Sequence, residues 1–129
     1  MQFSLVATAL LASATVLGAT AFAAENPSAA QAGKKHFVRC LACHSASATG
    51  RPTTGPHLEG IVGRQAASLA DFVYSAELRS QDFVWDEARL DAFLKSPQAT
   101  HPGMCLTFNG LPRPEDRAAL IAYLKDPTQ

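Results

Sequence analysis

Apolar residues recur at helical spacing in three separate parts of the chain. The first helix is predicted over residues 29–40, where Ala29, Gly33 and Phe37 fall on one face. A glycine inside a helix costs about 1 kcal/mol relative to alanine, so Gly33 is expected where another backbone comes close. The pattern therefore predicts an early helix with a contact surface at its glycine.

Two further helices are predicted in the second half of the chain. Asp86 is suited to cap a helix that ends at Ser96-Pro97, because proline removes a backbone donor and clashes with the preceding turn. The last helix opens at Pro114, with two acidic residues in its first turn, and closes at Pro127. Its inner face is formed by Ala119, Leu120, Tyr123 and Leu124.

The first and last helices are expected to cross, with Gly33 against Leu120 and Tyr123. A short helix could lie within residues 75–81, whereas residues 45–63 and 98–111 are rich in turn-forming residues and are predicted to be irregular. No stretch alternates cleanly between apolar and polar positions, as a half-buried strand would. The predicted fold class is therefore all-α.

The beginning of the chain has a different composition from the rest. Residues 3–24 are almost wholly apolar, and Ala21-Phe22-Ala23 has the small-x-small pattern of a signal-peptidase site. We therefore expect residues 1–23 to be a cleaved signal peptide and residues 24–129 to form one domain. The usual basic residue near the start is missing, and the alternative is an uncleaved anchor, since about 20 apolar residues can span a bilayer.

The distribution of charged residues along the chain limits the classes of binding partner that we expect. The 11 basic and 11 acidic residues balance, and all of them follow the apolar leader in mixed order. This distribution does not resemble the basic footprint of a nucleic-acid-binding protein, so no nucleic-acid partner is expected. A domain of about 105 residues has a thin apolar core, which a bound macrocycle could supplement.

The residues best suited to bind a cofactor or a metal are Cys40, Cys43 and His44. Two thiols three positions apart, followed at once by an imidazole, are typical of covalent haem attachment: each thiol can add to one vinyl group, and the histidine can bind the iron. A zinc site would need a second pair of ligands at metal-binding spacing. A thioredoxin-like dithiol would need a thiolate at a helix N-terminus, whereas this motif follows a predicted helix. Haem attachment is favoured, and it leaves Cys105 as the odd thiol.

From about residue 32 to its end, the chain resembles the class I cytochromes c, the family of mitochondrial cytochrome c and its small bacterial relatives. The resemblance implies a cytochrome c fold of few helices and long loops wrapped around one covalently attached haem c, whose edge is exposed for electron exchange. The segments that carry it are Gly33 and Phe37, the Cys40-x-x-Cys43-His44 motif, Thr54-Gly55-Pro56 through Gly63-Arg64, Trp85, Pro102-Gly103, Phe108-x-Gly110 and Leu120 to Lys125.

The resemblance also implies roles for four residues around the haem. Pro56 matches the residue whose backbone carbonyl orients the proximal imidazole, here that of His44. By position, Arg64, Tyr74 and Trp85 match the groups around the haem propionates. A guanidinium, a phenol and an indole could donate hydrogen bonds to carboxylates that would otherwise be costly to bury.

The segment that is expected to supply the second iron ligand differs from the family pattern. The family has Pro-Gly-Thr-Lys-Met-x-Phe where this chain has Pro102-Gly103-Met104-Cys105-Leu106-Thr107-Phe108, so leucine stands at the ligand position. In an extended loop, residues two apart point to the same side, and Met104 could then reach the iron. The alternatives are that Met104 only fills the pocket beside an open sixth site, or that Cys105 or His101 is the ligand.

These observations predict an exported, periplasmic one-electron carrier that is not an enzyme. Redox partner proteins are expected to dock at the haem edge of a monomer, with a disulfide dimer through Cys105 and membrane contact through a retained leader as alternatives. An open sixth site would instead suit a haem protein that senses a small gaseous ligand. Weak peroxidase activity at that site is a third hypothesis, which no distal acid–base pair supports.

Overall fold

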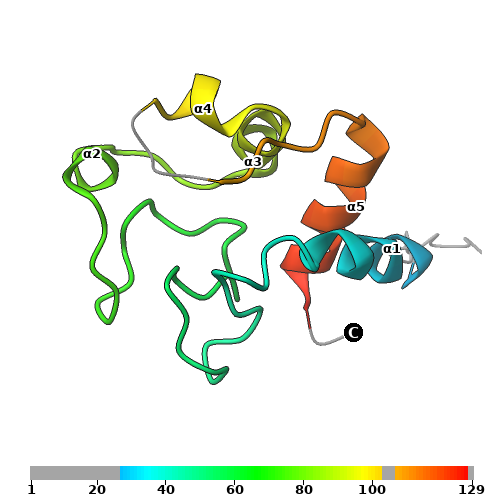
Figure 1. Cartoon of the computed structure of the whole chain (residues 1–129), viewed down its shortest axis with the longest axis horizontal. Coiled ribbons are helices and arrows are strands. Elements are labelled where there is room, and N and C mark those ends of the chain that lie inside the picture. The colour runs from blue at the N-terminus through cyan, green and yellow to red at the C-terminus, as the bar shows by residue number, and fades with distance from the viewer. Residues whose placement is uncertain (1–26, 103–106, 128–129) are drawn as a thin grey trace, which may run out of the picture.

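Residues 27–102 and 107–127 are described in the computed structural model and form helices joined by long irregular segments (Figure 1). The helices are α1 (Pro27–Phe37), α2 (Ala76–Arg79), α3 (Glu87–Lys95), α4 (Pro97–Thr100) and α5 (Pro114–Lys125). In this part of the chain, β-type pairing is limited to an isolated antiparallel bridge between Gln65 and Val84. The predicted all-α fold is confirmed.

α1 and α5 cross in close contact (Figure 1). Gly33 is buried at the crossing, where an added β-carbon would meet the carbonyl oxygen of Ala119 and lie 2.7 Å from Cβ of Tyr123. The rings of Phe37 and Tyr123 lie 5.3 Å apart, centroid to centroid. The expected contact with Tyr123 is confirmed, but the nearest atom belongs to the backbone of Ala119 rather than to Leu120. The glycine therefore allows two helix backbones to approach each other.

α1 is shorter than predicted. It ends at Phe37 and not at Cys40, because the next bonds, from Arg39 N to His36 O and from Cys40 N to Phe37 O, span only three residues. Basic side chains occupy its last turn, where the helix dipole favours positive charge. The motif that begins at Cys40 therefore lies in a series of tight turns after the helix.

The predictions around α3 are confirmed at both ends of the helix. The Asp86 side chain accepts a hydrogen bond from Arg89 N at 2.7 Å, as an N-cap does, and the helix ends at Lys95. Pro97, which was expected only to stop α3, also starts α4, a four-residue helix in a segment predicted to be irregular. Its fixed φ suits the first position of a helix as well as it disrupts a helix interior.

A buried arginine joins α5 to α3. Arg117 is only 6% exposed, and its guanidinium donates to both carboxylate oxygens of Asp91, at 2.7 and 3.3 Å. It also donates to the carbonyl oxygens of Leu111 and Pro112, at 3.0 and 2.9 Å. A bidentate ion pair with two further acceptors satisfies a charge that would otherwise be costly to bury. Sequence reasoning did not identify this contact.

The apolar core is shared between the helices and the long segment that precedes α2. The buried apolar residues are Phe37, Ile61, Ala66, Tyr74, Leu78, Trp85, Leu90, Leu94, Leu111, Leu120, Ile121, Tyr123 and Leu124.

Among the described residues, no helix is both long enough and apolar enough to cross a bilayer.

Candidate functional site

The Cys40 to His44 motif is held in a tight turn by its own backbone. The carbonyl oxygen of Cys40 accepts hydrogen bonds from Cys43 N at 3.0 Å and from His44 N at 2.8 Å. Cys40 is half-buried, Cys43 is exposed, and both are free thiols. One short turn therefore presents two thiols and an imidazole that could all engage the same ligand.

The environment of Cys40 does not suit a redox dithiol. Burial raises the pKa of the Cys40 thiol, with a smaller contribution in the same direction from Cys43 and an opposing one from Arg39. The motif also follows the C-terminal end of α1, whose dipole disfavours a thiolate. Reactive dithiols need a lowered pKa, so this alternative loses support. The described residues contain no group of three or more histidine, cysteine or acidic side chains that could hold a metal ion, and Cys105 lies outside them.

The His44 ring is oriented by a backbone carbonyl twelve residues away. Its Nδ1 lies 2.7 Å from the carbonyl oxygen of Pro56, to which the neutral imidazole can donate. Nε2 makes no hydrogen bond to a described residue, so its lone pair is available to a metal. A carbonyl that fixes both tautomer and ring orientation is the usual support of a metal-binding histidine.

Gly55 brings this loop against the motif. Its N–H donates to the Cys43 carbonyl at 2.6 Å, and an added β-carbon would lie 2.6 Å from both that oxygen and Cε1 of His44. Any side chain would therefore push the loop off the imidazole. A covalently attached haem needs two thiols for its vinyl groups and an imidazole nitrogen for its iron. The free thiols of Cys40 and Cys43 and Nε2 of His44 fit these needs. Thr54-Gly55-Pro56 was predicted as a turn, but the need for glycine was not.

Arg64, Tyr74 and Trp85 are brought together although 21 residues separate the first from the last. Trp85 N donates to the Arg64 carbonyl at 2.8 Å, which places the two residues on paired backbone segments. Burial lowers the pKa of Arg64, and Tyr74 is close enough to oppose this shift.

The Arg64 guanidinium is held by neutral groups only. It donates to the backbone carbonyls of His57, at 2.9 Å, and Glu59, at 3.1 Å. No carboxylate of the described residues pairs with it. A half-buried cation without a carboxylate partner fits the neighbourhood of a haem propionate.

The expected distal ligand, Met104, lies outside the described residues, as do Cys105 and Leu106. Met104 ligation therefore stays a prediction. His101, one of the alternative ligands, is described: its ring lies among those of Phe83, Trp85 and Phe93, with centroids 5.4–5.6 Å apart.

The chain is similar to known proteins over most of its length. The sequence model of the family described as Cytochrome c matches residues 30–127. The chain is 39% identical to "Cytochrome c2" of Rhodomicrobium vannielii over 116 residues, which are 90% of each protein. It is 37% identical to "Cytochrome c" of Cannabis sativa over 103 residues, 79% of this chain and 93% of the relative. Identity to "Cytochrome c-type cyt cy" of Rhodobacter capsulatus is 43% over 96 residues, 74% of this chain but only 47% of that longer relative.

Proposed function

The chain belongs to the cytochrome c family and is an electron carrier with one covalently attached haem c, and we propose that Cys40, Cys43 and His44 hold this haem. The observation that carries the proposal is the His44 imidazole, which is fixed through Nδ1 by the Pro56 carbonyl and leaves Nε2 for iron. The two thiols of the same turn supply the thioether links. The alternative function, a sensor of small gaseous ligands, receives no support from the relatives.

When bound, the haem supplies an iron that accepts and releases one electron. The chain's residues hold the group and tune it rather than transform a substrate. We propose that His44 is the proximal ligand and that Arg64, Tyr74 and Trp85 lie around the propionates. Positive charge held beside a propionate would offset the cost of burying the carboxylate.

Redox partners are proposed to dock at the exposed end of the motif. Two large apolar side chains flank the attachment cysteines and face solvent: Val38 is 64% exposed and Leu41 is 51% exposed. Exposed apolar residues beside a redox centre suit a transient contact that brings two haem edges together.

Leu41→Asp is expected to slow electron self-exchange between reduced and oxidised copies of the protein about tenfold. The change replaces an apolar contact by two carboxylates that face each other in the encounter complex, and about 1.4 kcal/mol suffices for that factor. Line broadening in mixed-oxidation NMR samples measures the rate. Val73→Asp is the matched control, because Val73 is 87% exposed but lies in the segment before α2. Equal slowing in both variants would argue against docking at Leu41.

We further propose that residues 1–23 direct export to the periplasm and are then removed, and that the mature protein is a monomer. The support is the small-x-small pattern that ends at Ala23 and the bacterial cytochrome c2 among the relatives. Mass spectrometry of the purified protein tests this proposal, because cleavage leaves a chain that begins at Ala24.

The sixth iron ligand is tested by absorption spectroscopy. If the Met104 sulfur binds iron, the oxidised protein shows a near-infrared sulfur-to-iron charge-transfer band, and Met104→Ala abolishes this band completely. The reduced variant should then bind carbon monoxide at least about a hundredfold faster than the unmodified protein, since no ligand has to leave.

Leu106→Met is the matched variant at the position where the family has its methionine. It should keep the charge-transfer band, because it offers a second thioether two residues along the loop. Rapid carbon monoxide binding to the unmodified protein, with no charge-transfer band, would contradict Met104 ligation and favour the open-site alternative.

A further inference from the structure

Two segments of the irregular region after α1 run side by side in the same direction. Backbone hydrogen bonds join them from Gly55 N to Cys43 O, at 2.6 Å, and from Leu58 N to Ser45 O, at 2.8 Å. The bond that orients the His44 ring lies between these two. The orientation of the imidazole therefore depends on how firmly the two segments are joined.

Glu59 joins the same segments through its side chain. Its Oε2 accepts hydrogen bonds from Ala48 N, at 2.6 Å, and from the Ser47 hydroxyl, at 3.1 Å. The bond from Ala48 is the main reason why the pKa of the Glu59 carboxyl is lowered; the bond from Ser47 and the nearby His57 also lower it, and desolvation opposes them. The carboxylate is therefore ionised at neutral pH, and both bonds are of the stronger, charge-assisted kind.

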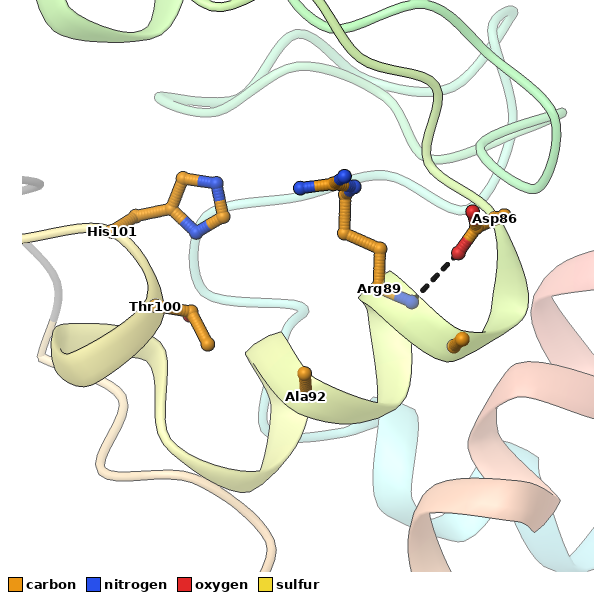
Figure 2. Close-up of a pocket in the computed structure, with 6 residues that line it drawn as sticks. Asp86, Arg89, Ala92, Thr100 and His101 are labelled. Atoms are coloured by element: carbon orange, nitrogen blue, oxygen red, sulfur yellow. Dashed lines mark hydrogen bonds between the residues drawn. The ribbon is translucent and has the colours of Figure 1, made fainter.

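The position of these bonds in the chain differs from that of a helix cap. Figure 2 shows the Asp86 carboxylate bonded to the N–H of Arg89, which is three residues further along the chain. That bond stabilises the start of α3. Glu59 and Ala48 are eleven residues apart and belong to different segments. Their bond therefore fixes one segment against the other.

The backbone of Glu59 contacts a second part of the candidate site. Its carbonyl oxygen accepts a hydrogen bond from the Arg64 guanidinium, at 3.1 Å. Arg64 is the cation that we propose to lie beside a haem propionate. Glu59 thus contacts the segment after His44 through its side chain and Arg64 through its backbone.

We propose that Glu59 is a positioning residue for the iron-binding histidine: its carboxylate holds the two segments together and so keeps the His44 Nδ1–H on the Pro56 carbonyl. This role presupposes that His44 is the proximal ligand, as proposed above. An imidazole that donates firmly through Nδ1 is a more basic ligand, and a more basic ligand stabilises ferric iron. Glu59 therefore lowers the reduction potential by way of His44.

Solvent exchange of the His44 ring N–H tests this positioning. The signal is followed by NMR in the reduced, haem-containing protein, where a haem ring-current shift identifies an imidazole bound to the iron. Glu59→Ala removes the acceptor of both bonds and is expected to speed the exchange at least about fivefold at constant pH, because the segments separate more often. Glu59→Gln keeps an oxygen that can accept from Ala48 N, so its exchange rate should lie between those of Glu59→Ala and the unmodified protein.

The same two variants separate the position of His44 from the charge of Glu59. Both remove one negative charge, so a purely electrostatic effect would shift their reduction potentials equally. Because only Glu59→Ala also loses the bond to Ala48, it should have the higher potential of the two. Equal potentials would contradict the positioning role.

Asp86→Ala is the matched control, because it removes a bond of the same kind between a carboxylate and a backbone N–H. It should lower the stability of the protein and leave the exchange of the His44 ring N–H unchanged. An exchange rate in Glu59→Ala equal to that of the unmodified protein, or equal acceleration in Asp86→Ala, would overturn the proposal. A His44 signal without a ring-current shift in the unmodified protein would instead overturn the assignment of His44 as proximal ligand, and the role of Glu59 with it.

Discussion

Replacing both motif cysteines, Cys40→Ser/Cys43→Ser, is expected to abolish covalent haem retention, so that acidified acetone extracts all of the haem. A serine hydroxyl cannot form the thioether that a thiol makes with a vinyl group. The domain is also expected to lose part of its helical structure, because its thin apolar core would lose the contacts that the covalently held macrocycle supplies. Haem absorbance of the extracted protein and circular dichroism measure the two effects.

Cys105→Ser is the matched control, since it makes the same chemical change at the third cysteine of the chain. It should retain haem through extraction as fully as the unmodified protein. Retention of haem by the Cys40→Ser/Cys43→Ser protein, or its loss from Cys105→Ser, would show that attachment uses a different cysteine.

Gly33→Ala is expected to lower the free energy of unfolding by about 3 kcal/mol, although alanine is the better helix former. The added methyl group would meet the Ala119 carbonyl and Tyr123 Cβ, so α1 and α5 must move apart. For a domain of this size, the melting temperature should fall by more than about 10 °C. Denaturant unfolding of the haem-containing protein gives the free energy directly.

Lys34→Ala provides the comparison, because Lys34 is the next residue of α1 and is exposed. It should change the free energy of unfolding by less than about 0.5 kcal/mol. If Gly33→Ala were as stable as Lys34→Ala, the close approach of the two helices would contribute nothing to stability.

The parts of the fold that were predictable depend on signals carried by neighbouring residues. The cap at Asp86 and the start of α5 at Pro114 follow from local backbone chemistry, and both are observed. The start of α4 at Pro97 was missed because one proline can end a helix and begin the next. Arg117 was missed for another reason: its partner Asp91 lies 26 residues away, and no local pattern announces a buried ion pair.

The candidate site also has a part that the sequence predicts and a part that only the structure shows. Cys40, Cys43 and His44 form a short local pattern from which the sequence predicts haem attachment, and their role remains a proposal. The neighbours of His44 depend on a loop that returns to the motif, and the packing of Gly55 against the imidazole appears only in three dimensions. The pairing of Arg64 with Trp85 likewise depends on backbone hydrogen bonds between distant segments, and their haem-side role remains a proposal.

The crossing of α1 and α5 has a consequence for the order of events during synthesis. The contact between α1 and α5 closes a loop of some 80 residues, so it cannot form before α5 has left the ribosome. Until then, α5 does not cover the thin apolar core, and the turn at Cys40 stays accessible. We expect this delay to leave Cys40, Cys43 and His44 accessible to haem until α5 has been made.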